Sequence, residues 1–176
     1  MTQLKCTRFT SIKNTKPTRT EDLISVLHEI ASEKYRLQIE KIRGQENPSK
    51  SPLKDKLPLF TPTGIFSYRS MAGLEEYNGI ICLDIDNISN PEDLKERCKN
   101  LPWVYATFVT PSGQGLKVIV KTTATKETYK QIELLVSDAF NEATGCSRDN
   151  HCKDIARIQF VSYDPNIYIN ENSITF

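Results

Sequence analysis

The stretch Ile80-Ile-Cys-Leu-Asp-Ile-Asp86 is a short apolar run that ends in two acids. A continuous apolar run of this length is typical of a central strand, whose two faces are both covered. Side chains on a strand alternate between the faces, so Asp84 and Asp86 project together, while Ile81, Leu83 and Ile85 fill the opposite face. We therefore expect a buried strand whose end presents two carboxylates side by side.

The residues after Asp86 alternate between helical and strand patterns. Asn90 caps the first helix, and Pro91 occupies its first turn. The order strand–helix–strand–strand–helix–strand predicts an α+β fold with a split βαβ, ferredoxin-like or RRM-like sheet and two helices on one face. The expected elements are helices near residues 91–100 and 126–143 and sheet strands near 80–86, 103–109, 115–121 and 155–161, with a last strand at 167–169.

The first 78 residues are expected to form an α/β unit that flanks this core of residues 79–170, within one domain spanning 1–176. Residues 4–12 alternate as in a half-buried strand, and Thr20 is the expected cap of the helix that follows. The segment 44–64 is rich in Pro and Gly and is a poor candidate for regular structure.

Length and composition describe an ordinary globular protein of 176 residues, with 38% hydrophobic residues, 26% charged residues and a net charge of only +1. A protein that mainly grips duplex DNA would be more basic, because each neutralised phosphate needs a Lys or Arg. No apolar run approaches the roughly 20 residues that span a bilayer, and no secretory signal begins the chain. Five irregularly spaced cysteines fit reduced thiols. We expect a cytoplasmic protein with no membrane partner.

The two neighbouring carboxylates of Asp84 and Asp86 repel each other, and a divalent cation would relieve that repulsion. Hard oxygen ligands of this kind suit Mg²⁺ or Mn²⁺, which proteins hold with a few carboxylates and substrate phosphates. The alternative is a solvated strand end whose acids cap residues 87–90.

The loop Pro111-Ser-Gly-Gln-Gly115 is a candidate phosphate site, because the amides of a glycine-rich loop can approach an anion closely. Ser112, Gly113 and Gly115 belong to it, and Lys117 follows on the next strand. The same residues could form an ordinary hairpin turn.

A third group of polar residues lies near the end of the chain, where Asp149 and Arg157 follow the second long helix. The guanidinium of Arg157 could fork onto phosphate oxygens. A surface ion pair of Arg157 with Asp154 or Asp164 is the alternative.

In their order and spacing, these motifs resemble the archaeo-eukaryotic primase (primase-polymerase) superfamily. Leu83-Asp-Ile-Asp86 matches its acid-x-acid strand, Ser112-Gly-Gln-Gly-Leu116 its Ser-Gly-x-Gly motif, and Asp149 its third acid. The nearest look-alike is the VirE N-terminal type of domain, carried by primase-helicase-like proteins of bacterial mobile elements. The resemblance covers about residues 40–170. Lys117 departs from the pattern, since His is usual at this position.

The resemblance implies a metal-dependent nucleotidyltransferase of primase-polymerase type that acts in the replication of a mobile element. Asp84, Asp86 and Asp149 would be the catalytic residues and would hold Mg²⁺ or Mn²⁺. The residues that would hold the nucleoside triphosphate are Ser112, Gly113, Gly115, Lys117 and Arg157. The implied partners are single-stranded or primed nucleic acid and a helicase domain or protein, with the chain as part of, or cognate to, a larger replication protein.

Lysine lacks the geometry and the near-neutral titration of histidine, so Lys117 weakens the case for polymerase activity more than the case for nucleotide binding. A non-catalytic nucleotide- or single-strand-binding module and a divalent-metal nuclease are therefore alternatives. Strand alternation predicts that the Lys117 ammonium faces the two acids.

Two further groups of residues are candidates for functional sites. Cys146, His151 and Cys152 could contribute to a zinc site, but they include no Cys-x-x-Cys and no clear fourth ligand. The basic residues between Lys34 and Lys56 could contact a template backbone or form a solvated charged face.

Overall fold

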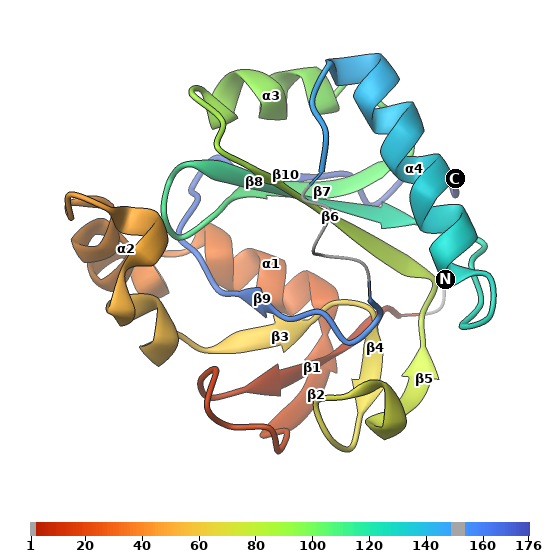
Figure 1. Cartoon of the computed structure of the whole chain (residues 1–176), viewed down its shortest axis with the longest axis horizontal. Coiled ribbons are helices and arrows are strands. Elements are labelled where there is room, and N and C mark those ends of the chain that lie inside the picture. Colours follow the sequence, from red (N-terminus) through yellow and green to blue (C-terminus); the bar gives the residue numbers. More distant parts are fainter. Residues whose placement is uncertain (1–2, 149–153) are drawn as a thin grey trace.

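The computed structural model describes residues 3–148 and 154–176, shown as a cartoon in Figure 1. In this part of the chain, four α-helices combine with three sheets in which all paired strands are antiparallel. The α+β class predicted from the sequence is confirmed.

The core sheet has the strand order β10-β7-β8-β6. Its strands are β6 (Ile80–Asp86), β7 (Val104–Val109), β8 (Gly115–Lys121) and β10 (Tyr168–Ile169). β8 lies between β6 and β7 and is antiparallel to both, so β6 and β7 run parallel to each other. The helix α3 (Pro91–Cys98) connects β6 with β7, which gives the split βαβ arrangement. α3 and α4 (Tyr129–Thr144) cover one face of this sheet (Figure 1).

One expected strand of the core sheet lies elsewhere. Only Gln159–Phe160 of the expected strand 155–161 forms a strand, β9, and it pairs with β3 (Leu59–Thr61) in the second sheet. β10 takes the place at the edge beside β7. The prediction was wrong because apolar–polar alternation shows that a segment is extended without showing which strand it pairs with.

The second sheet has the order β2-β1-β3-β9 and combines strands from both ends of the chain. Its remaining strands are β1 (Lys5–Phe9) and β2 (Arg19–Asp22), and a small third sheet pairs β4 (Gly64–Phe66) with β5 (Leu74–Tyr77). The other helical elements are α1 (Leu23–Ala31), α2 (Arg36–Arg43), η1 (Glu33–Tyr35), η2 (Pro48–Lys50), η3 (Pro52–Lys56) and η4 (Met71–Gly73).

Two details of the N-terminal half differ from expectation. Thr20 lies within β2, opposite Thr7, and Asp22 occupies the position before α1. The segment 44–64 also holds more regular structure than its Pro and Gly content predicts, because the backbone of β3 pairs with β1 on one side and β9 on the other.

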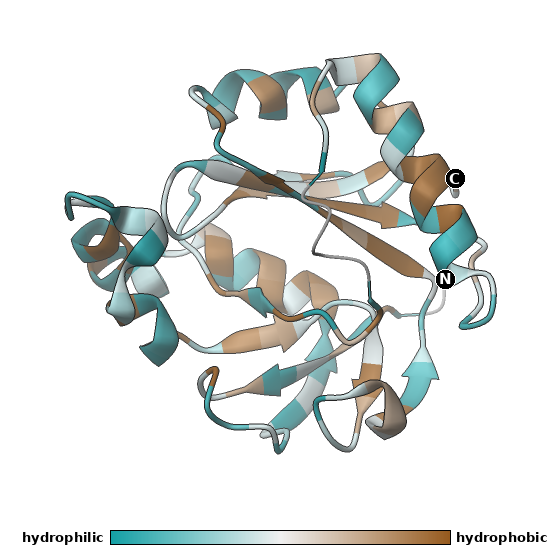
Figure 2. Ribbon diagram, in the orientation of Figure 1, coloured by the Kyte–Doolittle hydropathy of each residue, from teal (hydrophilic) through white to brown (hydrophobic). Residues whose placement is uncertain are grey.

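Two apolar cores lie on opposite faces of the core sheet. One contains Leu94 of α3 and Phe140 of α4, and the other contains Phe60 of β3 and Leu27 of α1. α1 therefore packs between the two sheets, and Figures 1 and 2 show this helix and its hydrophobic residues there.

The buried face of α4 is not the one that apolar spacing alone indicates. Helical spacing places Leu135 on the same side as Tyr129 and Val136, but Leu135 is 51% exposed. Glu133 is buried instead and forms an ion pair with Arg148. A buried ion pair thus allows an acidic side chain to be buried at a helix position that the spacing of apolar residues does not predict.

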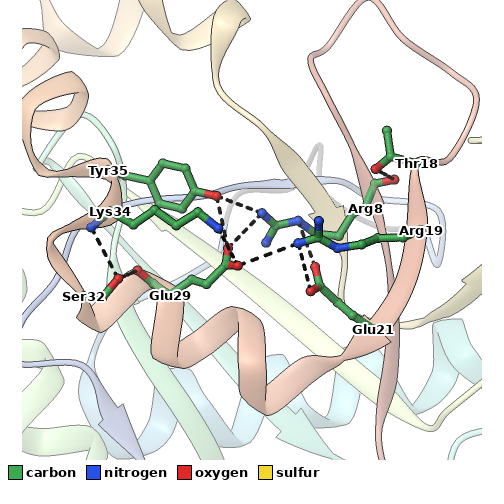
Figure 3. Close-up of polar contacts among 8 residues, drawn as sticks. All are labelled: Arg8, Thr18, Arg19, Glu21, Glu29, Ser32, Lys34 and Tyr35. Carbon is green, nitrogen blue, oxygen red and sulfur yellow. Dashed lines mark hydrogen bonds and ion pairs between the residues drawn. The ribbon is translucent and has the colours of Figure 1, made fainter.

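A polar network joins β1, β2, α1 and η1 at the second sheet (Figure 3). Arg8 is only 4% exposed, and its Nη2 donates to Glu29 Oε2 at 3.0 Å and to Tyr35 Oη at 2.9 Å. Arg8 Nε pairs with Glu21 at 3.1 Å, and Lys34 Nζ donates to Glu29 Oε1 at 2.6 Å. The buried guanidinium of Arg8 therefore forms ion pairs with carboxylates of both β2 and α1.

Glu29 should make the stability of the fold sensitive to acid. Burial raises the pKa of the Glu29 carboxyl, but the hydrogen bonds from Lys34 and Tyr35 and the charge of Arg8 outweigh it and lower the pKa below its ordinary value. A lowered pKa stabilises the folded state above the unfolded-state pKa of about 4.3, and this contribution is lost as the pH falls through the folded-state pKa.

We expect the free energy of unfolding of Glu29→Gln, measured by urea titration, to fall less steeply than that of wild type as the pH is lowered below about 4.3. Glu142→Gln, which removes one exposed carboxylate from α4, controls for the loss of a negative charge. A Glu29→Gln profile parallel to that of wild type would show that the network does not depend on this carboxylate.

Candidate functional site

A pocket of about 380 Å³ lies where β6, the β7–β8 hairpin and the segment before β9 meet. We name it the β6–β8 pocket. It brings together five of the predicted site residues, namely Asp84, Asp86, Ser112, Lys117 and Arg157. The other lining residues are Ile12, Ser49, Lys54, Asn87, Thr110, Pro111, Ile158 and Phe160.

The pairing of β6 with β8 places the acids and the lysine. Asp84 lies opposite Lys117, and Asp86 lies opposite Gly115. Lys117 Nζ forms an ion pair with Asp84 Oδ2, and both side chains are largely buried. The expected orientation of Lys117 toward the acids is confirmed. Asp86, one pleat further, is exposed at the strand end.

The glycines of the hairpin shape the pocket without lining it. A Cβ at Gly115 would lie 2.7 Å from Ile85 O and 3.0 Å from Asp86 Oδ1, so only glycine lets the Asp86 carboxylate lie this close to the backbone of β8. Gly113 has a φ of +76°, and its N–H donates to Thr110 O at 2.9 Å. Because the turn hydrogen bond occupies the Gly113 N–H, an anion in the pocket would be bound by hydroxyls and cationic side chains and not by this amide.

The base of the hairpin is held by a buried ion pair. Lys95 of α3 is 0% exposed, and its Nζ lies 2.9 and 2.8 Å from the two carboxylate oxygens of Asp164. Asp164 also accepts the N–H of Val109, the last residue of β7, at 2.8 Å. Ser162 Oγ donates to Val109 O at 2.6 Å. The strand that leads to Ser112 is thus tied to α3 and to the segment after β9.

The sequence allows two roles for Arg157, a contact with phosphate or an ion pair with Asp154 or Asp164. Asp164 pairs with Lys95 instead. Within residues 3–148 and 154–176, Arg157 forms no ion pair, and it lines the pocket that holds the two acids. This position keeps the guanidinium available to a ligand.

Sequence reasoning did not single out two polar residues of the pocket, Ser49 and Lys54. Ser49 Oγ donates to Gln114 Oε1 at 2.7 Å, which joins the segment 47–56 to the hairpin tip. Lys54 Nζ donates to Ser49 O at 3.0 Å. Burial lowers the pKa of Lys54, as does the nearby charge of Lys117, although Asp86 and Asp84 oppose them. Lys54 was one of several basic residues in its segment, and its spacing carried no signal that it would face the acids.

The third expected carboxylate, Asp149, lies outside the described residues, as do His151 and Cys152 of the zinc hypothesis. In the described part of the chain, no three His, Cys, Asp or Glu side chains form a group that could hold a metal ion. Asp84 and Asp86 nevertheless offer two hard oxygen donors on one strand face, which suits Mg²⁺ or Mn²⁺. The Lys117 ammonium already contacts one of them.

One protein family, described as BT4734-like, N-terminal domain, matches residues 52–169 of the chain. This range contains β3 to β10 and nearly every residue of the pocket. No curated protein and no solved structure matches the chain. Among the described residues, no helix is both long and apolar enough to cross a bilayer.

Lys95→Met should destabilise the fold by about 3–5 kcal/mol, because it leaves the buried Asp164 carboxylate without its ammonium. Lys99→Met is the matched control, since Lys99 follows the same helix but pairs with Glu96 at the surface, where an ion pair contributes about 0–1 kcal/mol. Urea unfolding measures both. Equal, small losses in the two variants would show that the Lys95–Asp164 pair does not hold the hairpin base.

Proposed function

The chain belongs to the family of BT4734-like N-terminal domains, and we propose that it binds a nucleoside triphosphate and a divalent cation in the β6–β8 pocket and transfers the nucleotidyl group, as a metal-dependent nucleotidyltransferase of primase-polymerase type. One observation carries the proposal. Two carboxylates and three cationic side chains, Lys54, Lys117 and Arg157, line a single pocket.

The charges of the pocket suit a polyphosphate bound together with a metal ion. The three cations can each contact phosphate oxygens, and Arg157 can do so with two parallel hydrogen bonds. The hydroxyls of Ser112 and Thr110 lie 3.1 Å apart on the hairpin and can donate to the same group. The volume of about 380 Å³ falls in the range of small-molecule sites, and Ile158 and Phe160 provide an apolar wall for a sugar or base.

Asp84 and Asp86 would hold the Mg²⁺ or Mn²⁺ ion, with Asp149 proposed as the third carboxylate. The ion, when bound, would supply positive charge to the phosphate oxygens at the reacting centre. The ion pair between Lys117 and Asp84 must break before the Asp84 carboxylate can coordinate the ion with both oxygens. The phosphates give the ammonium an alternative anionic partner, so we propose that triphosphate and cation bind more tightly together than either does alone.

The Lys117–Asp84 ion pair also favours a second candidate, a non-catalytic nucleotide-binding module. An ammonium that stays on Asp84 would neutralise the carboxylate that a catalytic ion needs. Primer extension in Mn²⁺ buffer separates the two candidates, because only the nucleotidyltransferase lengthens a primer. Loss of full-length strand in the same buffer would instead identify the nuclease alternative.

The proposed setting is the replication of a mobile element, with single-stranded or primed nucleic acid and a helicase domain or protein as partners. We also propose that the protein works in the cytoplasm. Cys6, Cys82, Cys98 and Cys146 are free thiols, and burial raises the pKa of Cys6, Cys82 and Cys98 to about 12, which keeps these three unreactive.

Asp86→Asn should abolish Mn²⁺-dependent triphosphate binding, measured by calorimetry, with a change in unfolding free energy within about 0.5 kcal/mol because the side chain is exposed. Asp84→Asn should lose the same binding but also lose stability, since it weakens the partner of the buried Lys117. Asp138→Asn, an exposed acid of α4, is the control. Unchanged binding in Asp86→Asn would contradict the metal role of this strand end.

Lys117→Ala should weaken triphosphate binding more than monophosphate binding, because the lost contact is a charge interaction with the distal phosphates. Lys121→Ala provides the comparison, since Lys121 lies on the same strand but outside the pocket. Calorimetry with both nucleotides measures the ratio. An equal loss for the two nucleotides would remove Lys117 from phosphate recognition. Lys117→His is expected to raise any primer extension.

A further inference from the structure

A second hollow, of about 410 Å³, adjoins the β6–β8 pocket. Ile12, Arg157 and Ile158 line both hollows, so they form the wall between them. On its far side, the second hollow is lined by Arg69 and Met71. The two hollows are therefore neighbours that share the Arg157 side chain.

Two loops line the second hollow, one through Ile12 and the other through Arg69 and Met71, and Arg69 joins them. The loops are residues 10–18, between β1 and β2, and residues 67–73, between β4 and β5. Arg69 Nη2 donates to Ile12 O at 2.7 Å, and the Arg69 N–H donates to Thr15 O at 3.0 Å. These bonds fix the loops to each other at the end of the molecule that carries β1, β2, β4 and β5 (Figure 1).

The segments that contribute to the second hollow carry mostly positive charge, unlike the whole chain. Residues 10–18, 67–73 and 154–160 together contain four cations, Lys13, Lys16, Arg69 and Arg157, against the single acid Asp154. Lys13 and Lys16 are exposed. The whole chain has a net charge of only +1, so the local excess points to an anionic ligand that extends beyond the nucleotide pocket.

The loop formed by residues 67–73 also exposes two large side chains. Tyr68 is 46% exposed, and Met71, which lines the second hollow, is 37% exposed. The loop that carries them is held by its own backbone, with Ser67 N–H donating to Gly73 O at 2.9 Å. Basic side chains interspersed with exposed aromatic and apolar groups are typical of single-strand binding, in which bases stack while the backbone follows the cations.

We propose that the surface formed by residues 10–18 and 67–73 binds single-stranded nucleic acid that leads into the β6–β8 pocket past Arg157. A duplex is a poorer fit, because four cations can neutralise only a few of its phosphates and its stacked bases cannot reach Tyr68. The role of this strand as the template rests on the proposed nucleotidyl transfer, whereas the binding itself does not.

The test is fluorescence anisotropy of labelled oligo(dT) and oligo(rU) with the full chain, in the absence of metal and nucleotide, over a range of salt concentrations. Tyr68→Ala should weaken binding about tenfold or more, and Tyr68→Phe should retain it, because a phenyl ring also stacks on a base. Lys13→Ala with Lys16→Ala should make the log–log salt dependence shallower by about 1.4, at about 0.7 per phosphate contact.

Lys126→Ala with Lys130→Ala is the matched control, since it removes two exposed lysines at the start of α4. Loss of binding of either probe in the Tyr68→Ala and Lys13/Lys16 variants, with retention in this control, supports the inference. Equal weakening by both lysine pairs together with wild-type binding by Tyr68→Ala would overturn it. Thermal melting of every variant confirms that each one folds.

Triphosphate calorimetry on the wild-type protein separates this inference from the proposed function. If the protein binds single strands in a way that depends on Tyr68 but binds no triphosphate, the binding surface is supported and the proposed nucleotidyltransferase activity is contradicted. The opposite result is triphosphate binding together with a strand affinity that is unchanged by substitution of Tyr68 and of the two lysines. It would support the proposed function and contradict the binding surface.

Discussion

The antiparallel pairing of β6 with β8 is the constraint on which the candidate site depends. Its register puts Asp84 opposite Lys117 and Asp86 opposite Gly115, on the strand face turned away from α3 and α4. A shift of one residue would turn both acids toward the apolar core under the helices, where no partner could compensate their charges. The requirement to bury the residues of β6 that alternate with the acids therefore also fixes where the acids point.

A second constraint is the path of the chain after residue 154. β9 completes the second sheet, the next residues hold the β7–β8 hairpin through Ser162 and Asp164, and β10 closes the edge of the core sheet. A single segment therefore links the two sheets and the hairpin. Arg157 stands at the start of this segment, which explains how one side chain can line both the nucleotide pocket and the neighbouring basic surface.

Much of the core sheet follows from local patterns in the sequence. The apolar run at Ile80–Asp86 and the alternation at Gly115–Lys121 predict both strands with the bounds that the structure shows, and hence the shared face of Asp84 and Lys117. Lys54 could not be predicted, because it lines the pocket from a short 3₁₀ segment whose position depends on contacts with the hairpin, such as the one made by Ser49. The role of Asp149 remains a prediction.

The partner of β9 was beyond local reasoning for a similar reason, since Leu59 and Phe160 face each other across about 100 residues of chain. That separation has a consequence for synthesis on the ribosome. β3 is synthesised with one edge unpaired, and β9, the strand that covers this edge, follows about 100 residues later. Such long-range pairing slows folding and leaves a hydrophobic edge exposed to other chains in the meantime.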